Sequence, residues 1–282
     1  MSLVNLAELL KPANEQKYAV GAFDVFSIEM ASAVIRAAEE TKSPVILMYV
    51  EAFDSLVSME SYVAFLRSLA EEASVPVCIH LDHATNLEII QRAVRCGFSS
   101  VMIDASDKSF EENVVTTANV VGICKPLGIS VESELGHVPG NEGMYSDDTS
   151  VYTEVESAKE FVDRTGVDAL AVAIGTIHGV YKSTPILSFD RCAQIKSATN
   201  NLPLVIHGGS GLSDEDFCRV IAAGINKVNV FTDLTIAAME YLRSGEITNK
   251  THYFSASMQV AEIIKQATIA KLQRFGCIGK AA

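Results

Sequence analysis

The sequence predicts an α/β fold in which parallel strands close into a (β/α)8 barrel, and three observations predict it. Short runs rich in β-branched residues alternate with longer amphipathic stretches, as expected of repeated β-α units. Eight such runs occur within 282 residues, a length that suits a single eight-stranded barrel. The first strand and turn, residues 21–27, contain no Gly-x-Gly-x-x-Gly phosphate loop, which disfavours the alternative of a doubly wound open sheet.

The eight predicted strand runs are spaced so that helices fit between them. In chain order they cover residues 19–25, 44–50, 75–84, 100–106, 129–136, 168–175, 202–211 and 225–232. Helices are predicted over residues 27–42 and over residues 155–166, where Gly166 provides a C-terminal stop. A final helix, from about Ser255 to Phe275, follows the last unit. Because no Pro/Gly/Ser-rich linker divides the chain, residues 1–282 are predicted to form a single domain.

The composition excludes several classes of protein. The chain has 22 Lys plus Arg against 35 Asp plus Glu, a net charge of −13, so neither nucleic acid nor an anionic membrane is an expected partner. No apolar run reaches the ~18 residues of a membrane span, and the N-terminus lacks a signal-peptide layout, which predicts a cytoplasmic protein. The six cysteines form no Cys-x-x-Cys pair and are interpreted as small buried hydrophobic residues.

A barrel of this class carries its chemistry where the strands end and the β-α loops begin. Polar residues that are unusual in a core gather at those positions in six of the predicted strands. They are His80, Asp82, His83, Asp104, Glu132, Glu134, His178, His207, Asn229 and Thr232. The sequence therefore predicts one functional rim at the carboxyl ends of the strands.

Three histidines of this rim suggest a zinc site. His83, His178 and His207 follow different strands at equivalent positions, and a catalytic zinc takes three protein ligands and keeps one position open. Each histidine alone fits equally well as a polar loop residue, but three at equivalent positions favour ligation. His80 lies deeper in its strand and is interpreted as a core or ligand-supporting residue. His137 and His252 have no ligand-like spacing.

A phosphate site is predicted beside the metal. Gly208, Gly209, Ser210 and Gly211 follow the seventh strand, and residues 229–232 follow the eighth, where barrels commonly bind phosphate through backbone N–H groups. A Lewis-acid zinc beside a phosphorylated small molecule would polarise a carbonyl and stabilise an enediolate. This combination indicates either aldol chemistry or an isomerisation.

Several motifs in order make the resemblance to a known family specific. They are YAVGAFDV, KSPVIL, HLDHA, GFSSVMIDAS, FEENV, VESELG, RTGVDALAVAIGTIHGVYK, LPLVIHGGSGL, GINKVNV and FGCIGKA. With these runs the chain resembles the class II, zinc-dependent fructose- and tagatose-bisphosphate aldolases along nearly its whole length. The resemblance implies reversible cleavage of a ketose 1-phosphate or 1,6-bisphosphate to dihydroxyacetone phosphate and an aldehyde. It also implies Zn²⁺, allows a monovalent cation, and suggests a homodimer or homotetramer.

The resemblance assigns roles to matching residues. His83, His178 and His207 match the zinc ligands, Asp82 matches the acid/base, and Glu142 matches a loop glutamate that abstracts the substrate proton. Asp104 and Glu134 match acidic positions that orient ligands or hold a second metal position. The positions that match substrate-binding residues are Gly179, Lys182, Gly208, Gly209, Ser210, Asn229, Val230, Phe231 and Thr232.

Three departures from the family pattern lie in regions that discriminate substrates. Where bisphosphate-cleaving members carry Asp-Pro-Arg, whose arginine contacts the distal phosphate, this chain has Asn249-Lys250-Thr251. Phe231 replaces the aspartate of the fructose type and the alanine of the tagatose type. Val50-Glu51-Ala52 replaces a Ser/Thr-Pro-Gly turn. We therefore expect an acceptor aldehyde other than glyceraldehyde 3-phosphate, which either lacks a terminal phosphate or is differently substituted.

Two other functions fit the sequence less well. A Schiff-base aldolase needs a reactive lysine at a strand end, but Lys227 lies inside the eighth strand run and Lys182 lies in a loop. A non-catalytic barrel subunit of an aldolase complex would be expected to lose metal ligands or the acid/base. Asp82 and the three histidines are all present, which favours catalysis.

Overall fold

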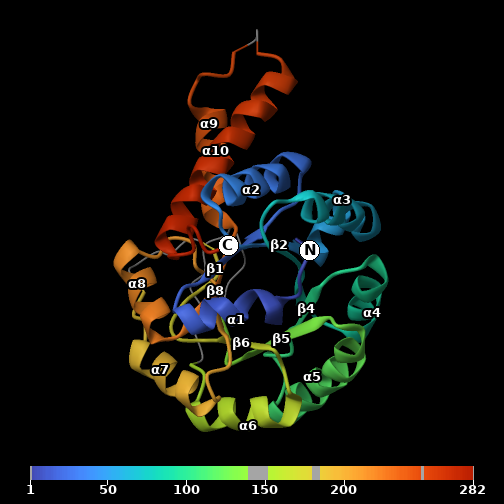
Figure 1. The fold of residues 1–282 in the computed structure, drawn as a ribbon, viewed down its shortest axis with the longest axis vertical. Helices are drawn as coiled ribbons and strands as arrows, with labels where there is room; N and C mark the ends of the chain where they lie inside the picture. Colours follow the sequence, from blue (N-terminus) through green and yellow to red (C-terminus); the bar gives the residue numbers. More distant parts are fainter. Residues whose placement is uncertain (1, 139–151, 180–184, 249–250, 282) are drawn as a thin grey trace.

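The computed structural model describes residues 2–138, 152–179, 185–248 and 251–281 and forms the predicted barrel (Figure 1). The strands pair in parallel in chain order, and β1 pairs with β8, so the sheet is closed. Each predicted run contains one observed strand. The strands are β1 Val20–Asp24, β2 Val45–Val50, β3 Val77–Ala84, β4 Ser100–Ile103, β5 Ser130–Leu135, β6 Ala169–Val172, β7 Leu204–Ile206 and β8 Ile225–Val230.

Most of the helices surround the barrel and cover the outer faces of the strands (Figure 1). The helices of the described residues are α1 Leu6–Gln16, α2 Ile28–Thr41, α3 Met59–Glu72, α4 Leu87–Cys96, α5 Phe110–Cys124, α6 Val155–Thr165, α7 Phe189–Ala198, α8 Asp214–Ala223, α9 Thr232–Arg243 and α10 Tyr253–Arg274, with 3₁₀ turns η1 Glu51–Ser55 and η2 Lys125–Leu127. The predicted stop of α6 is confirmed, because Gly166 adopts a left-handed conformation there. The predicted final helix corresponds to α10, which begins two residues earlier, at Tyr253.

The strands are buried on both faces, because helices cover the outside of a parallel barrel and side chains fill its inside. In β1 all five residues are buried, and β2 is buried from Val45 to Tyr49. The outward side chains pack against the apolar faces of the helices, as Val34 and Ala37 of α2 illustrate, since both have no exposed surface. The polar rim residues therefore stand on a fully buried apolar scaffold.

Helix α1 was not predicted from the sequence. Its N-terminus is a capping box, in which the Asn5 side chain accepts a hydrogen bond from Glu8 N and the Glu8 carboxylate accepts one from Asn5 N. Ala7 N donates to the hydroxyl of Ser130, the first residue of β5, at 3.0 Å. In Figure 1, α1 crosses the opening of the barrel. Because α1 lies at the amino ends of the strands, the carboxyl ends are left as the side for chemistry.

The interpretation of the cysteines is wrong for two of the six. Cys78, Cys124, Cys192 and Cys277 are buried, but Cys96 is half-buried and Cys218 is exposed. Cys218 follows the buried Phe217 in α8, and one step along a helix turns a side chain by about 100° towards solvent. All six are free thiols, as expected. Among the described residues, no helix has the length and apolarity needed to cross a membrane.

Candidate metal centre and active site

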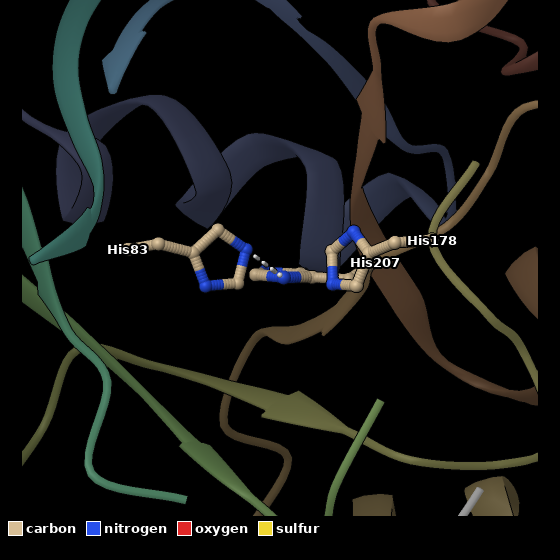
Figure 2. A group of neighbouring side chains, drawn as sticks. All are labelled: His83, His178 and His207. Atoms are coloured by element: carbon tan, nitrogen blue, oxygen red, sulfur yellow. Dashed lines mark hydrogen bonds between the residues drawn. The ribbon is translucent and has the colours of Figure 1, made fainter. Parts of the chain in front are cut away.

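The three histidines predicted from the sequence lie together at the carboxyl end of the barrel (Figure 2). One ring nitrogen from each of His83, His178 and His207 lies within 4.8 Å of the others. Of these nitrogens, His83 Nε2 and His207 Nδ1 are 2.9 Å apart. Two nitrogens bound tetrahedrally to one zinc at about 2.0–2.1 Å lie roughly 3.3 Å apart, so this donor set suits a zinc ion.

An irregularity in β3 brings His83 to this centre. Between Leu81 and Ala84, β3 holds one residue more than β4 holds between the partners Val101 and Ile103. His83, inside this bulge, has a left-handed φ of 49°. In a regular strand Asp82 and His83 would face opposite sides, whereas the bulge lets both side chains reach the rim.

Carboxylates determine which ring nitrogen of His83 and of His207 faces the candidate metal centre. His83 Nδ1 lies 2.8 Å from Asp104 Oδ2, and His207 Nε2 lies 3.1 Å from Glu132 Oε1. A carboxylate accepts hydrogen bonds, so the ring N–H of each histidine points to its carboxylate. His83 Nε2 and His207 Nδ1 are then the nitrogens that face the centre, as a metal site requires.

The electrostatics of the centre favour a cation. Burial lowers the pKa of His83, but the carboxylates of Asp82, Asp104 and Glu134 outweigh burial and raise this pKa to about 10. Burial holds the pKa of His207 well below its ordinary value, so this ring is neutral. The negative surroundings that hold a proton on His83 also attract a divalent metal ion.

Glu134 lies beside the histidines, and one of its carboxylate oxygens is available to bind a metal ion. Its Oε1 accepts a hydrogen bond from Val138 N at 3.1 Å. Its buried Oε2 has no hydrogen-bond partner among the described residues and lies 3.6 Å from His207 Nδ1. Burial and the charge of Asp104 raise the pKa of Glu134 to about 8. With His83 and Asp104, Glu134 forms a second group with metal-ligating geometry.

Asp82 is held in place as a proton-transferring group would be. Its carboxylate is buried, accepts hydrogen bonds from Asn229 Nδ2 at 3.2 and 3.1 Å, and lies 3.8 Å from His83 Nε2. Burial acts to raise the pKa of Asp82, but the charges of His83 and Lys227 outweigh it and lower this pKa. Asp82 is therefore a carboxylate directed at the candidate metal centre.

The predicted phosphate-binding segments lie on the neighbouring strands β7 and β8. Ser210 Oγ accepts a hydrogen bond from Asp233 N at 3.3 Å, which ties the Gly-rich turn to the start of α9. Gly209 has no room for a side chain, since an added Cβ would lie 2.8 Å from Asn229 O. Backbone N–H groups and the positive end of a helix dipole together suit an anion. Gly179 is buried at the same rim, one residue after His178.

Gly208 is the turn position most sensitive to substitution. It has a φ of +66°, and an added Cβ would lie 2.1 Å from Ile177 O. We expect Gly208→Ala to lower the free energy of unfolding by about 1–3 kcal/mol, measured by urea denaturation. Gly122→Ala is the matched control, because Gly122 lies in α5 with nothing within 4 Å of an added Cβ, and it should gain about 0.5–1 kcal/mol. Equal stability changes in the two variants would contradict the steric argument.

The remaining predicted residues are placed as follows. His80 is buried, and its Nδ1 lies 2.9 Å from Ser100 Oγ. Its Nε2 has no hydrogen-bond partner among the described residues, so only one ring nitrogen is satisfied as expected of a core histidine. His137 and His252 are exposed. Thr251 is hydrogen-bonded to Thr248. Glu142, Lys182, Asn249 and Lys250 lie outside the described residues.

Phe231 belongs to an aromatic cluster that the sequence analysis did not predict. Its ring centroid lies 6.2 Å from that of Phe26 and 5.9 Å from that of Phe53, and Phe26 and Phe53 are 5.7 Å apart. These rings follow β1, β2 and β8, which are neighbours in the closed barrel. No sequence signal joins them, because their proximity depends on the closure of β1 on β8.

A closed parallel barrel with convergent histidines at its carboxyl rim defines a barrel enzyme with a candidate metal centre. The model of the family "Fructose-bisphosphate aldolase class-II" matches residues 4–280. The chain therefore belongs to the class II fructose-bisphosphate aldolase family, and the predicted resemblance and lyase class are confirmed.

Individual relatives match over nearly the full chain. The YdjI protein of Escherichia coli K12 is 42% identical over 271 residues, which are 95% of this chain and 96% of that protein. The fructose-bisphosphate aldolase of Geobacillus stearothermophilus is 40% identical over 293 aligned positions, with 100% of both chains covered. The crystal structure of the YdjI aldolase superimposes with a TM-score of 0.89, at 38% identity, covering 99% of this chain and 100% of that one.

Proposed function

We propose that the chain is a zinc-dependent aldolase that reversibly cleaves a ketose 1-phosphate or 1,6-bisphosphate to dihydroxyacetone phosphate and an aldehyde. The observation that carries the proposal is the convergence of His83, His178 and His207 with the buried carboxylate of Asp82, 3.8 Å from His83 Nε2. Family membership supports the reaction class. The adjacent Gly-rich turn supports a phosphorylated substrate.

In this proposal His83, His178 and His207 would hold a zinc ion, which would supply Lewis-acid polarisation of the substrate carbonyl. Asp82 holds or donates the proton at the oxygen that changes from alkoxide to hydroxyl as the carbon–carbon bond forms. Asn229 donates to both oxygens of Asp82 and so fixes the orientation of the carboxylate. The segments after β7 and β8 hold the phosphate and position the substrate for reaction. Glu142 stays a predicted base for the carbon-bound proton.

We further propose an acceptor aldehyde without a terminal phosphate. The cluster of Phe26, Phe53 and Phe231 gives part of the rim an apolar surface, which suits an uncharged group better than a phosphate dianion. Arg92, next to η1, is not free to bind phosphate, because its guanidinium pairs with Asp54 and Glu60. Thr251 cannot replace the planar donor fork of an arginine.

Substrate preference tests this proposal directly. We expect kcat/KM for fructose 1-phosphate and related ketose 1-phosphates to exceed that for fructose 1,6-bisphosphate by at least about tenfold, equivalent to about 1.4 kcal/mol in transition-state stabilisation. Steady-state cleavage rates measure it, together with a screen of aldehydes against dihydroxyacetone phosphate on samples of known zinc content. A large preference for the bisphosphate would contradict the acceptor proposal and leave the aldolase assignment intact.

A homodimer or homotetramer, a monovalent cation and a cytoplasmic location stay predictions. Apolar side chains exposed on the arm of α9 and α10, at the top of Figure 1, support self-association. They are Ile236, Met239, Leu242, Tyr253, Phe254 and Met258.

A further inference from the structure

A charged pair is buried inside the barrel beneath the histidines, and it joins Glu132, the hydrogen-bond partner of His207, to a lysine that has no role in the proposed reaction. Glu132 of β5 and Lys227 of β8 both have no exposed surface. Lys227 Nζ lies 2.9 Å from Glu132 Oε2 and donates a hydrogen bond to Oε1 at 3.1 Å. Burying two charges costs several kcal/mol per ion before their attraction is counted, so hydrophobic residues would serve a purely structural purpose as well.

The pair contacts His207 on the side away from the candidate metal centre. Glu132 Oε1 lies 3.1 Å from His207 Nε2, and His207 Nδ1 faces His83 Nε2. Lys227 only donates hydrogen bonds, so the Glu132 oxygens that face it act as acceptors. The His207 proton is then confined to Nε2, and the lone pair is directed from Nδ1 towards the centre.

Glu132 also lies within metal-ligating distance of His80 and Asp82. The ammonium of Lys227, 2.9 Å from Oε2, would repel a second cation bound there. His80 Nε2 is 3.7 Å from Glu132 Oε2, beyond hydrogen-bond distance. These contacts favour a supporting role for Glu132 over direct ligation.

We propose that the Glu132–Lys227 pair is a positioning device that fixes the tautomer and ring orientation of His207 and thereby raises the affinity of the rim for zinc. This inference rests on the proposed zinc-dependent function. Outer carboxylate partners of metal-bound histidines typically change metal affinity by about 10- to 100-fold. Neither Glu132 nor Lys227 touches the reacting atoms in this proposal.

The test measures zinc affinity in the full chain, apart from turnover. Glu132→Gln keeps the shape of the side chain, but an amide both donates and accepts, so it no longer dictates the position of the His207 proton. We expect the zinc dissociation constant, from competition with a chromogenic chelator, to rise roughly 10- to 100-fold. The visible spectrum of the Co²⁺-substituted variant should change as well, since it reports the geometry of the ligands.

Two further variants separate positioning from stability. Asp168→Asn alters a half-buried carboxylate that accepts a hydrogen bond from Val131 N at 2.8 Å, at the opposite end of the barrel, and it should leave the zinc dissociation constant unchanged. The double variant Glu132→Gln/Lys227→Met removes both charges, so no unpaired lysine is left buried. It should unfold at a higher temperature than Glu132→Gln alone and still bind zinc more weakly than the unmodified chain.

The outcomes distinguish this inference from the proposed function. Equal zinc affinity in the unmodified chain and in folded Glu132→Gln overturns the inference and leaves the zinc aldolase proposal standing. If Glu132→Gln does not fold, the double variant decides, and an unchanged dissociation constant there overturns the inference too. Absence of zinc binding by the unmodified chain would contradict both.

Discussion

Replacing Asp82 with alanine is expected to lower kcat for ketose cleavage by roughly 100- to 10,000-fold, the usual contribution of general acid–base catalysis. The carboxylate is the group placed to exchange a proton beside the histidines, and Asn229 fixes it there. The three histidines stay in place, so the zinc content should stay at the level of the unmodified chain. Cleavage rates and metal analysis on the same samples measure both quantities.

Asp82→Asn provides the matched control for shape. Its amide oxygen can still accept a hydrogen bond from Asn229, but it cannot take up or release a proton at neutral pH. We expect it to be nearly as inactive as the alanine variant. A kcat within tenfold of the unmodified chain would remove Asp82 from the proton transfer.

Removal of the metal should have an effect at least as large. We expect His207→Ala to weaken zinc binding more than about 100-fold, because loss of a ligand exceeds the effect of losing a supporting carboxylate. Activity should disappear with the zinc and return when zinc is added to chelator-treated, unmodified chain. Zinc titration and turnover before and after dialysis measure these effects.

His252→Ala is the control, because this imidazole is exposed where α10 begins. Its zinc content should equal that of the unmodified chain. Full activity after complete zinc removal would instead support Schiff-base chemistry. The structure weakens that alternative, since Lys227 is buried and paired with Glu132.

The sequence predicts those parts of the candidate site that depend only on the order of the strands. Once eight strand runs are counted, the residues after each run must meet at one rim, which brings His178 and His207 together. His83 reaches the same centre only with the bulge in β3, which the sequence does not predict. The sequence does not predict the contact between Asp82 and Asn229, because this contact depends on the relative heights of β3 and β8.

The parts that could not be predicted depend on register and on side-chain pairing across the barrel. From the sequence, Glu132 is a strand-end acid and Lys227 is a lysine inside the eighth strand run, with nothing to join them. Their pairing beneath His207 requires the exact relative heights of β5 and β8. The signal that was available is the two-residue spacing of Glu132 and Glu134, which turns both to the same face of β5. The sequence also contains a pattern that predicts the start of helix α1, because Asn5 and Glu8 have the spacing of a capping box.

The bulge in β3 has a consequence for protein design. Asp82 and His83 are adjacent in sequence, and they serve one site only because the strand carries one extra residue between Leu81 and Ala84. Idealised barrels are built from regular strands without residues at positive φ, so grafting these side chains onto one would direct Asp82 and His83 to opposite faces. A designer would have to transfer the irregular backbone, including the left-handed conformation of His83, together with the residues it carries.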